Sequence, residues 1–204
     1  MRNALLTLFV AAVVLLLAAL VPMPAATHTA GYAIKIGDGE GHGSGVHIGR
    51  GYILTAAHVV ASGKKLVITT DNGASFDVEV LWRNAEYDVA LLKLSNYAQI
   101  DHINLSCVKP KVGTRITAYG SPLSLDFVST SGTLVGHNNI AMWKESAIVD
   151  ATIIMGMSGG PVVSNNKVVG ISVGVVVAPM GFSASITGLG VIVPGNTICR
   201  LMAR

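Results

Sequence analysis

Short apolar stretches, separated by glycine, asparagine, serine and proline, follow one another along this chain after residue 30. Valine, isoleucine and threonine dominate them, and residues 76–80 alternate between apolar and acidic side chains, as a half-buried strand does. Outside the N-terminal segment, no long stretch has the apolar period of an amphipathic helix. The pattern therefore predicts an all-β protein, a sandwich or a barrel. We expect strands at 32–36, 51–55, 66–70, 76–80, 89–94, 115–119, 167–173 and 188–193.

One short helix is expected at the C-terminal end, over residues 196–203, because Pro194 precedes it and Asn196 can cap it. The most linker-like stretch in the middle of the chain is Val-Lys-Pro-Lys-Val-Gly at 108–113. We therefore expect two units, 31–109 and 110–204.

The first 30 residues have the layout of an export segment. Arg2 is followed by the uncharged stretch 4–21 and then by prolines and small residues. That stretch is about as long as the ~20 residues that span a bilayer, so a cleaved signal peptide and a retained membrane anchor both remain open. In either case Arg2 keeps the N-terminal end in the cytoplasm, and the remainder is expected in the periplasm, outside the cell or on the outer face of a membrane.

The charge, aromatic content and cysteine content of the chain indicate which partners and which covalent links to expect. The net charge of +3 is mild, aromatic residues make up 5% of the chain, and no basic run contains interleaved aromatics, so a nucleic-acid partner is not expected. Cys107 and Cys199 are the only cysteines. Export would permit a disulfide between them, but buried free thiols fit the sequence as well, and both alternatives stay open.

Three short segments carry the residue types that make a serine nucleophile. His58 follows an apolar strand in Thr-Ala-Ala-His-Val-Val, Asp88 leads directly into the apolar Val-Ala-Leu-Leu, and Ser158 lies among glycines in Gly-Met-Ser-Gly-Gly-Pro. A serine hydroxyl is a poor nucleophile unless a base takes its proton, and that base needs an orienting group. We therefore interpret Ser158 as the nucleophile, His58 as the base and Asp88 as the orienting carboxylate.

The same glycines also match Gly-x-Ser-x-Gly, the nucleophile elbow of α/β-hydrolases. In that fold the acid and the histidine follow the serine. No His, Asp or Glu follows Ser158 in this sequence. The α/β-hydrolase interpretation is therefore excluded.

The order His, Asp, Ser is that of the chymotrypsin-like proteases. The chain resembles this family, and most closely its HtrA/Deg branch, over about residues 31–200. The resemblance implies two packed, six-stranded antiparallel β-barrels with the active site between them, the first contributing His58 and Asp88 and the second Ser158. The segments that carry it are 43–46, 51–60, 88–93, 150–162 and 188–197.

Two departures from the family pattern bear on regulation. Met157 stands where HtrA-type proteins usually have Asn and digestive proteases Asp, so capture of a new N-terminus after zymogen cleavage is not expected. The sequence ends at Arg204 without the PDZ domain that commonly follows in HtrA-type proteins, so regulation through such a domain is not expected either.

The remaining site residues follow from these roles and from the family position. The backbone N–H groups of Gly156 and Ser158 should hold the oxyanion. The resemblance implies a substrate pocket with one wall from Ala151, Thr152, Ile153 and Ile154, and the other from Ser172, Val173 and Gly174. The second wall could pair with the substrate backbone as an added strand. Neither wall contains an acid, so small or medium aliphatic residues are expected before the scissile bond.

One glycine-rich stretch of the sequence can be interpreted either as a metal site or as a hairpin loop. Asp38, Glu40 and His42 lie close together in a glycine-rich stretch, and His47 follows. A mobile hairpin loop accounts for this stretch without a metal, so no metal and no cofactor are expected.

The sequence thus predicts an exported serine endopeptidase that cleaves polypeptide substrates through an acyl-enzyme. The alternative is a catalytically silent protease fold used for binding, which Met157 and the altered pocket loop favour. A membrane scaffold with an incidental motif is a third hypothesis. Membrane contact through residues 4–21 and oligomerisation are left open.

Overall fold

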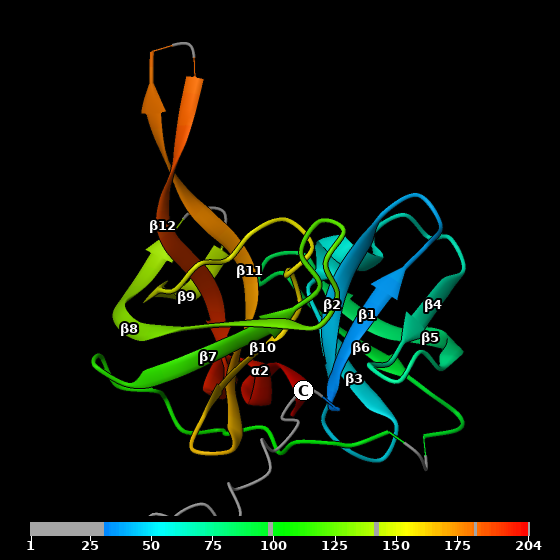
Figure 1. The fold of residues 1–204 in the computed structure, drawn as a ribbon. Helices are drawn as coiled ribbons and strands as arrows, with labels where there is room; N and C mark the ends of the chain where they lie inside the picture. The colour runs from blue at the N-terminus through cyan, green and yellow to red at the C-terminus, as the bar shows by residue number, and fades with distance from the viewer. Residues whose placement is uncertain (1–30, 98–99, 141–142, 182, 204) are drawn as a thin grey trace, which may run out of the picture.

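The computed structural model describes residues 31–97, 100–140, 143–181 and 183–203. They form two closed barrels of six antiparallel strands each, which lie side by side (Figure 1). The predicted double-barrel fold is confirmed. Residues 1–30, on which the signal or anchor was predicted, lie outside the described residues. Within the described part of the chain, no helix has the length and apolarity needed to cross a membrane.

The first barrel has the strand order β1-β2-β3-β6-β5-β4, and β4 closes the barrel against β1. Fully buried Ile34, Ile53, Ile68 and Leu92 fill its interior, which explains why these strands are rich in branched apolar residues. A single turn of 3-10 helix, η1 (Ala57–Val60), follows β3. The strands are β1 (Ala33–Gly37), β2 (His42–His47), β3 (Tyr52–Thr55), β4 (Leu66–Thr69), β5 (Ser75–Asn84) and β6 (Val89–Lys93).

The second barrel has the order β10-β11-β12-β9-β8-β7, and β10 closes it against β7. Leu134, Val149 and Ile192 are fully buried in its core. A further apolar cluster joins the barrels, with Leu54 and Val89 from the first and Ile171 and Val191 from the second. The elements are β7 (Arg115–Gly120), β8 (Val128–Ile140), β9 (Trp143–Asp150), β10 (Pro161–Ser164), β11 (Lys167–Met180), β12 (Ser183–Pro194) and the helix α2 (Gly195–Met202).

Each of the eight expected strands lies within one or two residues of an observed strand, although β5, β11 and β12 are longer than expected. The helix is also found, but its predicted cap is wrong. The helix begins at Gly195, one residue earlier than expected, and extended Pro194 occupies the cap position without a side-chain hydrogen bond. A side chain at position 195 would meet the Ser106 carbonyl oxygen at 2.3 Å, so close packing explains why a glycine begins this helix.

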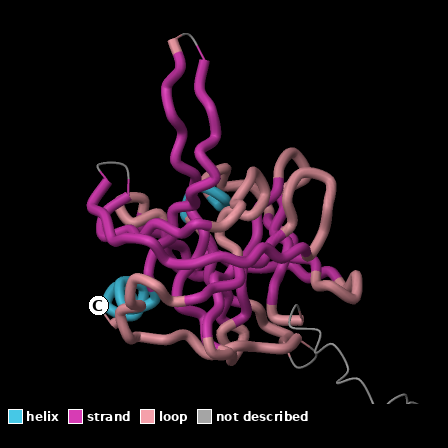
Figure 2. Tube along the Cα trace, turned by 60° about the vertical axis from the view of Figure 1, so that its left-hand side comes forward, coloured by secondary structure: helices cyan, strands magenta, loops and turns pink. Residues whose placement is uncertain are grey.

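Strands β11 and β12 continue past the second barrel as a long hairpin that projects from the body in both views (Figures 1 and 2). Side chains near its end are exposed, with 52% of Val177, 62% of Met180 and 62% of Ile186 accessible to solvent. No charged residue and no histidine occurs between residues 168 and 199. The sequence analysis ended the first of these strands at residue 173 and did not anticipate the projection.

A disulfide joins Cys107, in the segment between the barrels, to Cys199 in α2, with the two Cα atoms 5.6 Å apart. The alternative of free thiols is therefore wrong in the described structure. The bridge closes a loop with a sequence separation of 92 residues. Such a loop corresponds to roughly 2–5 kcal/mol of stabilisation, mainly by restricting the unfolded chain.

Candidate active site

His58 and Asp88 form a direct pair within the first barrel. His58 lies on η1 after β3, and Asp88 immediately precedes β6, the strand that pairs with β3. The His58 ring nitrogen Nδ1 lies 2.7 Å from Asp88 Oδ2, and the His58 backbone N–H donates to Asp88 Oδ1 at 2.9 Å. Asp88 is 6% exposed, so both carboxylate oxygens are satisfied in a buried position, as burial of a charge requires. The expected contact between these residues is present.

Asp88 has a positive φ of 54°, which L residues other than Gly, Asn and Asp rarely adopt. This conformation turns the chain between Tyr87 and β6 and directs the carboxylate back toward η1. The choice of Asp at this position therefore serves both the backbone and the pair with His58.

The loop that carries Ser158 needs glycine at two of its positions. Gly156 and Gly159 have φ values of 96° and 85°. A Cβ on Gly159 would lie 2.2 Å from both the Ser44 carbonyl oxygen and Thr55 Oγ1, so the first barrel approaches this loop too closely for any side chain. The Ser44 backbone N–H also donates to the Ser158 carbonyl at 2.7 Å. The loop belongs to the second barrel, but the first barrel holds it.

Both carbonyls around Gly156 have assigned partners. The Met155 carbonyl accepts from the Leu123 N–H at 3.0 Å, and the Gly156 carbonyl accepts from Ser44 Oγ at 2.7 Å. Since a trans peptide points its C=O and N–H in opposite directions, the first contact turns the Gly156 N–H away from Leu123. Within the described part of the chain, the N–H groups of Gly156 and Ser158 have no hydrogen-bond partner. They are available as the donors expected for an oxyanion.

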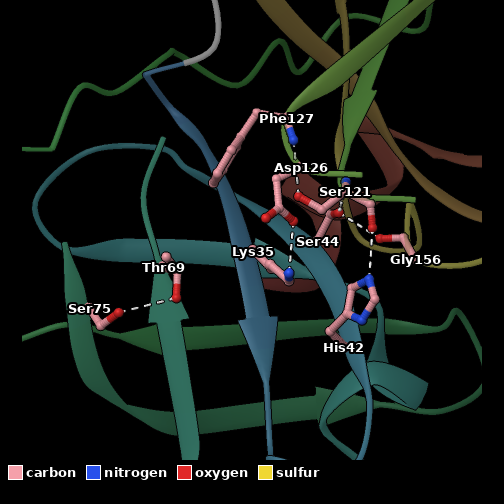
Figure 3. Close-up of polar contacts among 9 residues, drawn as sticks. All are labelled: Lys35, His42, Ser44, Thr69, Ser75, Ser121, Asp126, Phe127 and Gly156. Carbon is pink, nitrogen blue, oxygen red and sulfur yellow. Dashed lines mark hydrogen bonds and ion pairs between the residues drawn. The ribbon is translucent and has the colours of Figure 1, made fainter. Parts of the chain in front are cut away.

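A polar network ties this loop to the segment 121–127 and to the first barrel (Figure 3). Ser44 Oγ, which donates to Gly156, also accepts from the Ser121 N–H at 2.9 Å. His42 Nε2 lies 2.9 Å from the Ser121 carbonyl, and Lys35 forms an ion pair with Asp126 at 2.7 Å. The sequence analysis missed Ser44 and His42 as site residues. The sequence signals at these positions were the family resemblance of the segment 43–46, which contains Ser44, and the stretch weighed as a metal site, which contains His42.

Two pockets meet at His58. One, of about 280 Å³, is lined by His58, His42, Gly156 and Ser158, with the 38–41 turn at its edge. The other, of about 570 Å³, is lined by His58, Asp88 and Val173 together with apolar and basic residues of the first barrel, Ala57, Ala61, Arg83 and Ala85. His58 and Ser158 thus face a common space, although no hydrogen bond joins their side chains among the described residues. Hydrogen bonds of this kind often shorten only when substrate binds.

The four residues predicted as one pocket wall lie in different environments. Ala151 and Ile153 are each 4% exposed, Ile154 is half-buried, and Thr152 is exposed. Ile153 lies against Gly190 of β12, where an added Cβ would meet Ile153 Cδ1 at 2.4 Å. The Ile153 side chain is therefore packed directly against β12.

The three residues predicted as the opposite wall also lie in different environments. The Ser172 N–H donates to the Gly160 carbonyl, and the Ser172 carbonyl accepts from the Gly159 N–H. Ser172 is fully buried, so its backbone is not available to a substrate strand. Val173 lines the pocket with His58, and Gly174 pairs with Val191 of β12. Val173, itself one of the three residues predicted for this wall, is thus the one that borders the described pocket at His58.

Residues considered for a metal have other partners. Asp38 accepts from the N–H groups of Gly41 and Glu40, and these hydrogen bonds lower the pKa of its carboxyl to about 2. Glu40 forms an ion pair with Lys64. Residues 38–41 form the turn between β1 and β2, in agreement with the hairpin interpretation, and His42 is the first residue of β2. Among the described residues, no cluster of three or more His, Cys, Asp or Glu side chains forms a metal site.

Met157 is fully buried in the core of the second barrel. It belongs to the apolar cluster there, and its Cα and Cβ lie next to Gly120. The position that binds a new N-terminus in digestive proteases is therefore filled by an apolar side chain.

Comparison with known proteins agrees with this geometry. A family model of the trypsin-like peptidase domain matches residues 43–171, more than half of the chain, and the chain belongs to that family. Within it, the similar proteins are of the HtrA/Deg type. The periplasmic pH-dependent serine endoprotease DegQ of Escherichia coli (strain K12) is 33% identical over 173 residues, which cover 81% of this chain and 37% of DegQ. The periplasmic serine endoprotease DegP of Salmonella typhimurium is 30% identical over 170 residues, covering 79% of this chain and 35% of DegP.

Solved structures show the same fold. The HtrA-type protease AlgW with tripeptide has a TM-score of 0.77 at 21% identity, over 88% of this chain and 63% of that one. A serine endoprotease from Yersinia pestis has a TM-score of 0.74 at 22% identity, over 89% of this chain and 66% of that one. The chain spans little more than a third of the length of these two curated relatives.

Proposed function

We propose that the protein is an exported serine endopeptidase that hydrolyses peptide bonds through Ser158, His58 and Asp88. One observation carries this proposal: His58, which is paired with Asp88, borders the same pocket as Ser158, beside two backbone N–H groups that have no partner among the described residues. This arrangement supplies a nucleophile, an oriented base and an oxyanion site in one place.

In the proposed reaction, Ser158 Oγ forms a bond to the substrate carbonyl carbon while its proton passes to His58 Nε2. The N–H groups of Gly156 and Ser158 hold the oxyanion, and the loss of one such donor typically raises the barrier by about 2.7–4 kcal/mol. The C–N bond then breaks as His58 gives its proton to the leaving amine. Water repeats the sequence on the acyl-enzyme, and Asp88 keeps the imidazole in the required tautomer throughout.

The pocket supports a preference for small aliphatic residues before the scissile bond. Ile153 fills the space against Gly190, and no acidic side chain belongs to residues 151–154 or 172–174. Alanine or valine would therefore fit better than arginine, lysine or an aromatic residue.

Export is supported by the N-terminal segment of the sequence, by the Cys107–Cys199 disulfide and by the periplasmic relatives. Disulfides persist in oxidising compartments. Fractionation of cells that produce the whole chain should recover the protein outside the cytoplasm.

A fluorophosphonate probe tests the catalytic proposal. Labelling of the wild type at Ser158, located by mass spectrometry, and its loss in Ser158→Ala would support it. Profiling both proteins on a peptide library would then give the residue preference. A folded wild type that is neither labelled nor active would favour the silent binding protein instead.

A further inference from the structure

The two pockets that meet at His58 have only this residue in common among the described residues, so they lie on different sides of it. One pocket reaches Val173, which belongs to the wall predicted for the residue before the scissile bond. In the proposed reaction, this pocket receives the part of the substrate that precedes the bond. The other pocket, with Ser158 and the 38–41 turn, then receives the part that follows. This division rests on the proposed function.

Arg83 brings a positive charge without a partner into the pocket with Val173. It lies near the end of β5, and its side chain is exposed. Among the described residues it forms no ion pair, and its guanidinium makes a single hydrogen bond, to the Ala61 carbonyl at 3.5 Å. A guanidinium has five N–H donors, so most of them remain available to a carboxylate. The acid in the same pocket, Asp88, is already held by His58.

Asp38 brings a negative charge to the edge of the pocket with Ser158. Its Oδ1 accepts from the backbone N–H groups of Gly41 at 2.9 Å and Glu40 at 3.0 Å. Because these hydrogen bonds lower the pKa of its carboxyl to about 2, Asp38 is ionised at neutral pH. Within the described part of the chain, no cation forms an ion pair with it.

The charged groups around Asp38 are paired with one another. Two lysines border it on the side away from Ser158, and a third lies beyond the 38–41 turn. The ion pairs are Lys35–Asp126, Lys65–Asp77 and Lys64–Glu40. Since each pair has no net charge, Asp38 leaves this side of His58 with an uncompensated negative charge.

We propose that Arg83 and Asp38 select substrates by the direction of their charges: an acidic side chain before the scissile bond pairs with Arg83, and a basic side chain after it pairs with Asp38. A polypeptide with the reverse order brings like charges together at both positions, so it binds less tightly. Each exposed ion pair changes binding only by roughly twofold to fivefold, but the two act on the same substrate. The residue at the bond itself remains small and aliphatic.

Two isomeric peptides test the inference, because they have the same composition and net charge. One has glutamate at the second position before the scissile bond and lysine at the second position after it, and the other has these two residues exchanged. Hydrolysis by the wild type is measured as kcat/KM, with the cleaved bond located by mass spectrometry. Binding to Ser158→Ala is measured by fluorescence anisotropy. Both are measured at about pH 8, well above the ordinary pKa of imidazole.

The first isomer should be preferred on the order of tenfold at low salt, both in kcat/KM and in affinity. The preference should fall to about twofold or less at 1 M salt, where the Debye length is only about 3 Å. A preference that does not respond to salt would contradict an electrostatic origin.

Two variants that each remove one charge separate the two ends. Asp38→Asn keeps an oxygen for the N–H groups of the turn and should abolish the preference for lysine after the bond. Arg83→Gln should abolish the preference for glutamate before the bond. Peptides that carry only the lysine or only the glutamate measure these preferences one at a time. Asp71→Asn and Arg115→Gln are the matched controls and should leave both preferences intact, because the two residues are exposed and line neither pocket.

The outcomes separate this inference from the proposed function. If a fluorophosphonate does not label Ser158 and neither isomer is cleaved, the proposed function fails, while binding to Ser158→Ala still tests the charge preference. Equal binding and hydrolysis of the two isomers, or a preference for the reversed one, would overturn the inference. The same holds if the control variants abolish the preference as fully as Asp38→Asn and Arg83→Gln do.

Discussion

The two barrels contribute to the site in different ways. The first barrel holds His58 and Asp88 by contacts entirely its own, through a ring-to-carboxylate bond and a backbone-to-carboxylate bond. The second barrel carries Ser158 on a loop whose shape depends on the first, through Ser44 and the close approach at Gly159. The His58–Asp88 pair is thus a property of one barrel, and the loop that carries Ser158 is a property of the interface between both.

The largest effect should come from the pair itself. Asp88→Asn keeps the shape but leaves an amide that favours the wrong imidazole tautomer, so kcat should fall on the order of 10⁴-fold. Steady-state hydrolysis of a reporter peptide measures this. Near-normal kcat in a folded variant would show that the pair within the first barrel does not serve catalysis.

The second-largest effect should come from disturbing the contact between the first barrel and the loop that carries Ser158. Gly159→Ala places a Cβ against backbone of the first barrel at a positive φ, and should reduce the free energy of unfolding by roughly 3–5 kcal/mol. Gly63→Ala is the control, since Gly63 has a φ of 68° but nothing within 4 Å of an added Cβ. Gly63→Ala should reduce the free energy of unfolding by only about 1–2 kcal/mol. If urea titrations gave equal losses for both variants, the close approach of the first barrel to Gly159 would be contradicted.

Ser44→Ala tests whether the first barrel positions the oxyanion donors. Loss of the hydroxyl releases the Gly156 carbonyl and the Ser121 N–H, and should lower kcat about tenfold with little change in KM. Thr70→Val is the matched control, because Thr70 carries another buried hydroxyl next to β4, and its two hydrogen-bond partners, Asn72 Oδ1 and the Ala74 carbonyl, lie in its own turn. If both variants changed kcat equally, Ser44 would contribute to stability and would not position the oxyanion donors.

The smallest effect concerns a second histidine of the first barrel. Burial lowers the pKa of His47, whose Nδ1 faces the Ile100 and Asp101 carbonyls and whose Nε2 accepts from the Gly51 N–H. The unfolded chain therefore binds more protons than the native one below about pH 6.5, and stability should fall as the pH decreases through that region. Denaturant titrations between pH 5 and 7 should show a shallower dependence in His47→Gln than in the wild type.

Much of this fold could be predicted from the local pattern of side chains. Phe76 and Val78 are partly buried while Asp77 and Glu79 are exposed, as their alternation indicated, because a strand sends successive side chains to opposite faces. Asp88 was expected to be buried and paired from its place before an apolar strand. The helix cap was wrong because the packing of Gly195 against Ser106, not side-chain capping, decides where α2 begins.

The part of the hairpin beyond Val173 was not predicted, and the reason is different. Residues 174–187 are uncharged and mostly apolar, which is as typical of a buried strand as of an exposed hairpin. Only the register, in which β10 stops pairing while β12 continues, distinguishes these alternatives.

The sequence by itself determined the residue types of the site, the order of the three segments and the strand-rich character of both halves, because these depend on local chemistry and on spacing along the chain. The tertiary structure decided how Ser44 reaches across to Gly156, how Ser172 is held by the loop that carries Ser158, and where β11 and β12 continue past the barrel. Those features arise from contacts between residues tens to more than a hundred positions apart, and a linear pattern does not record how closely two folded barrels approach each other.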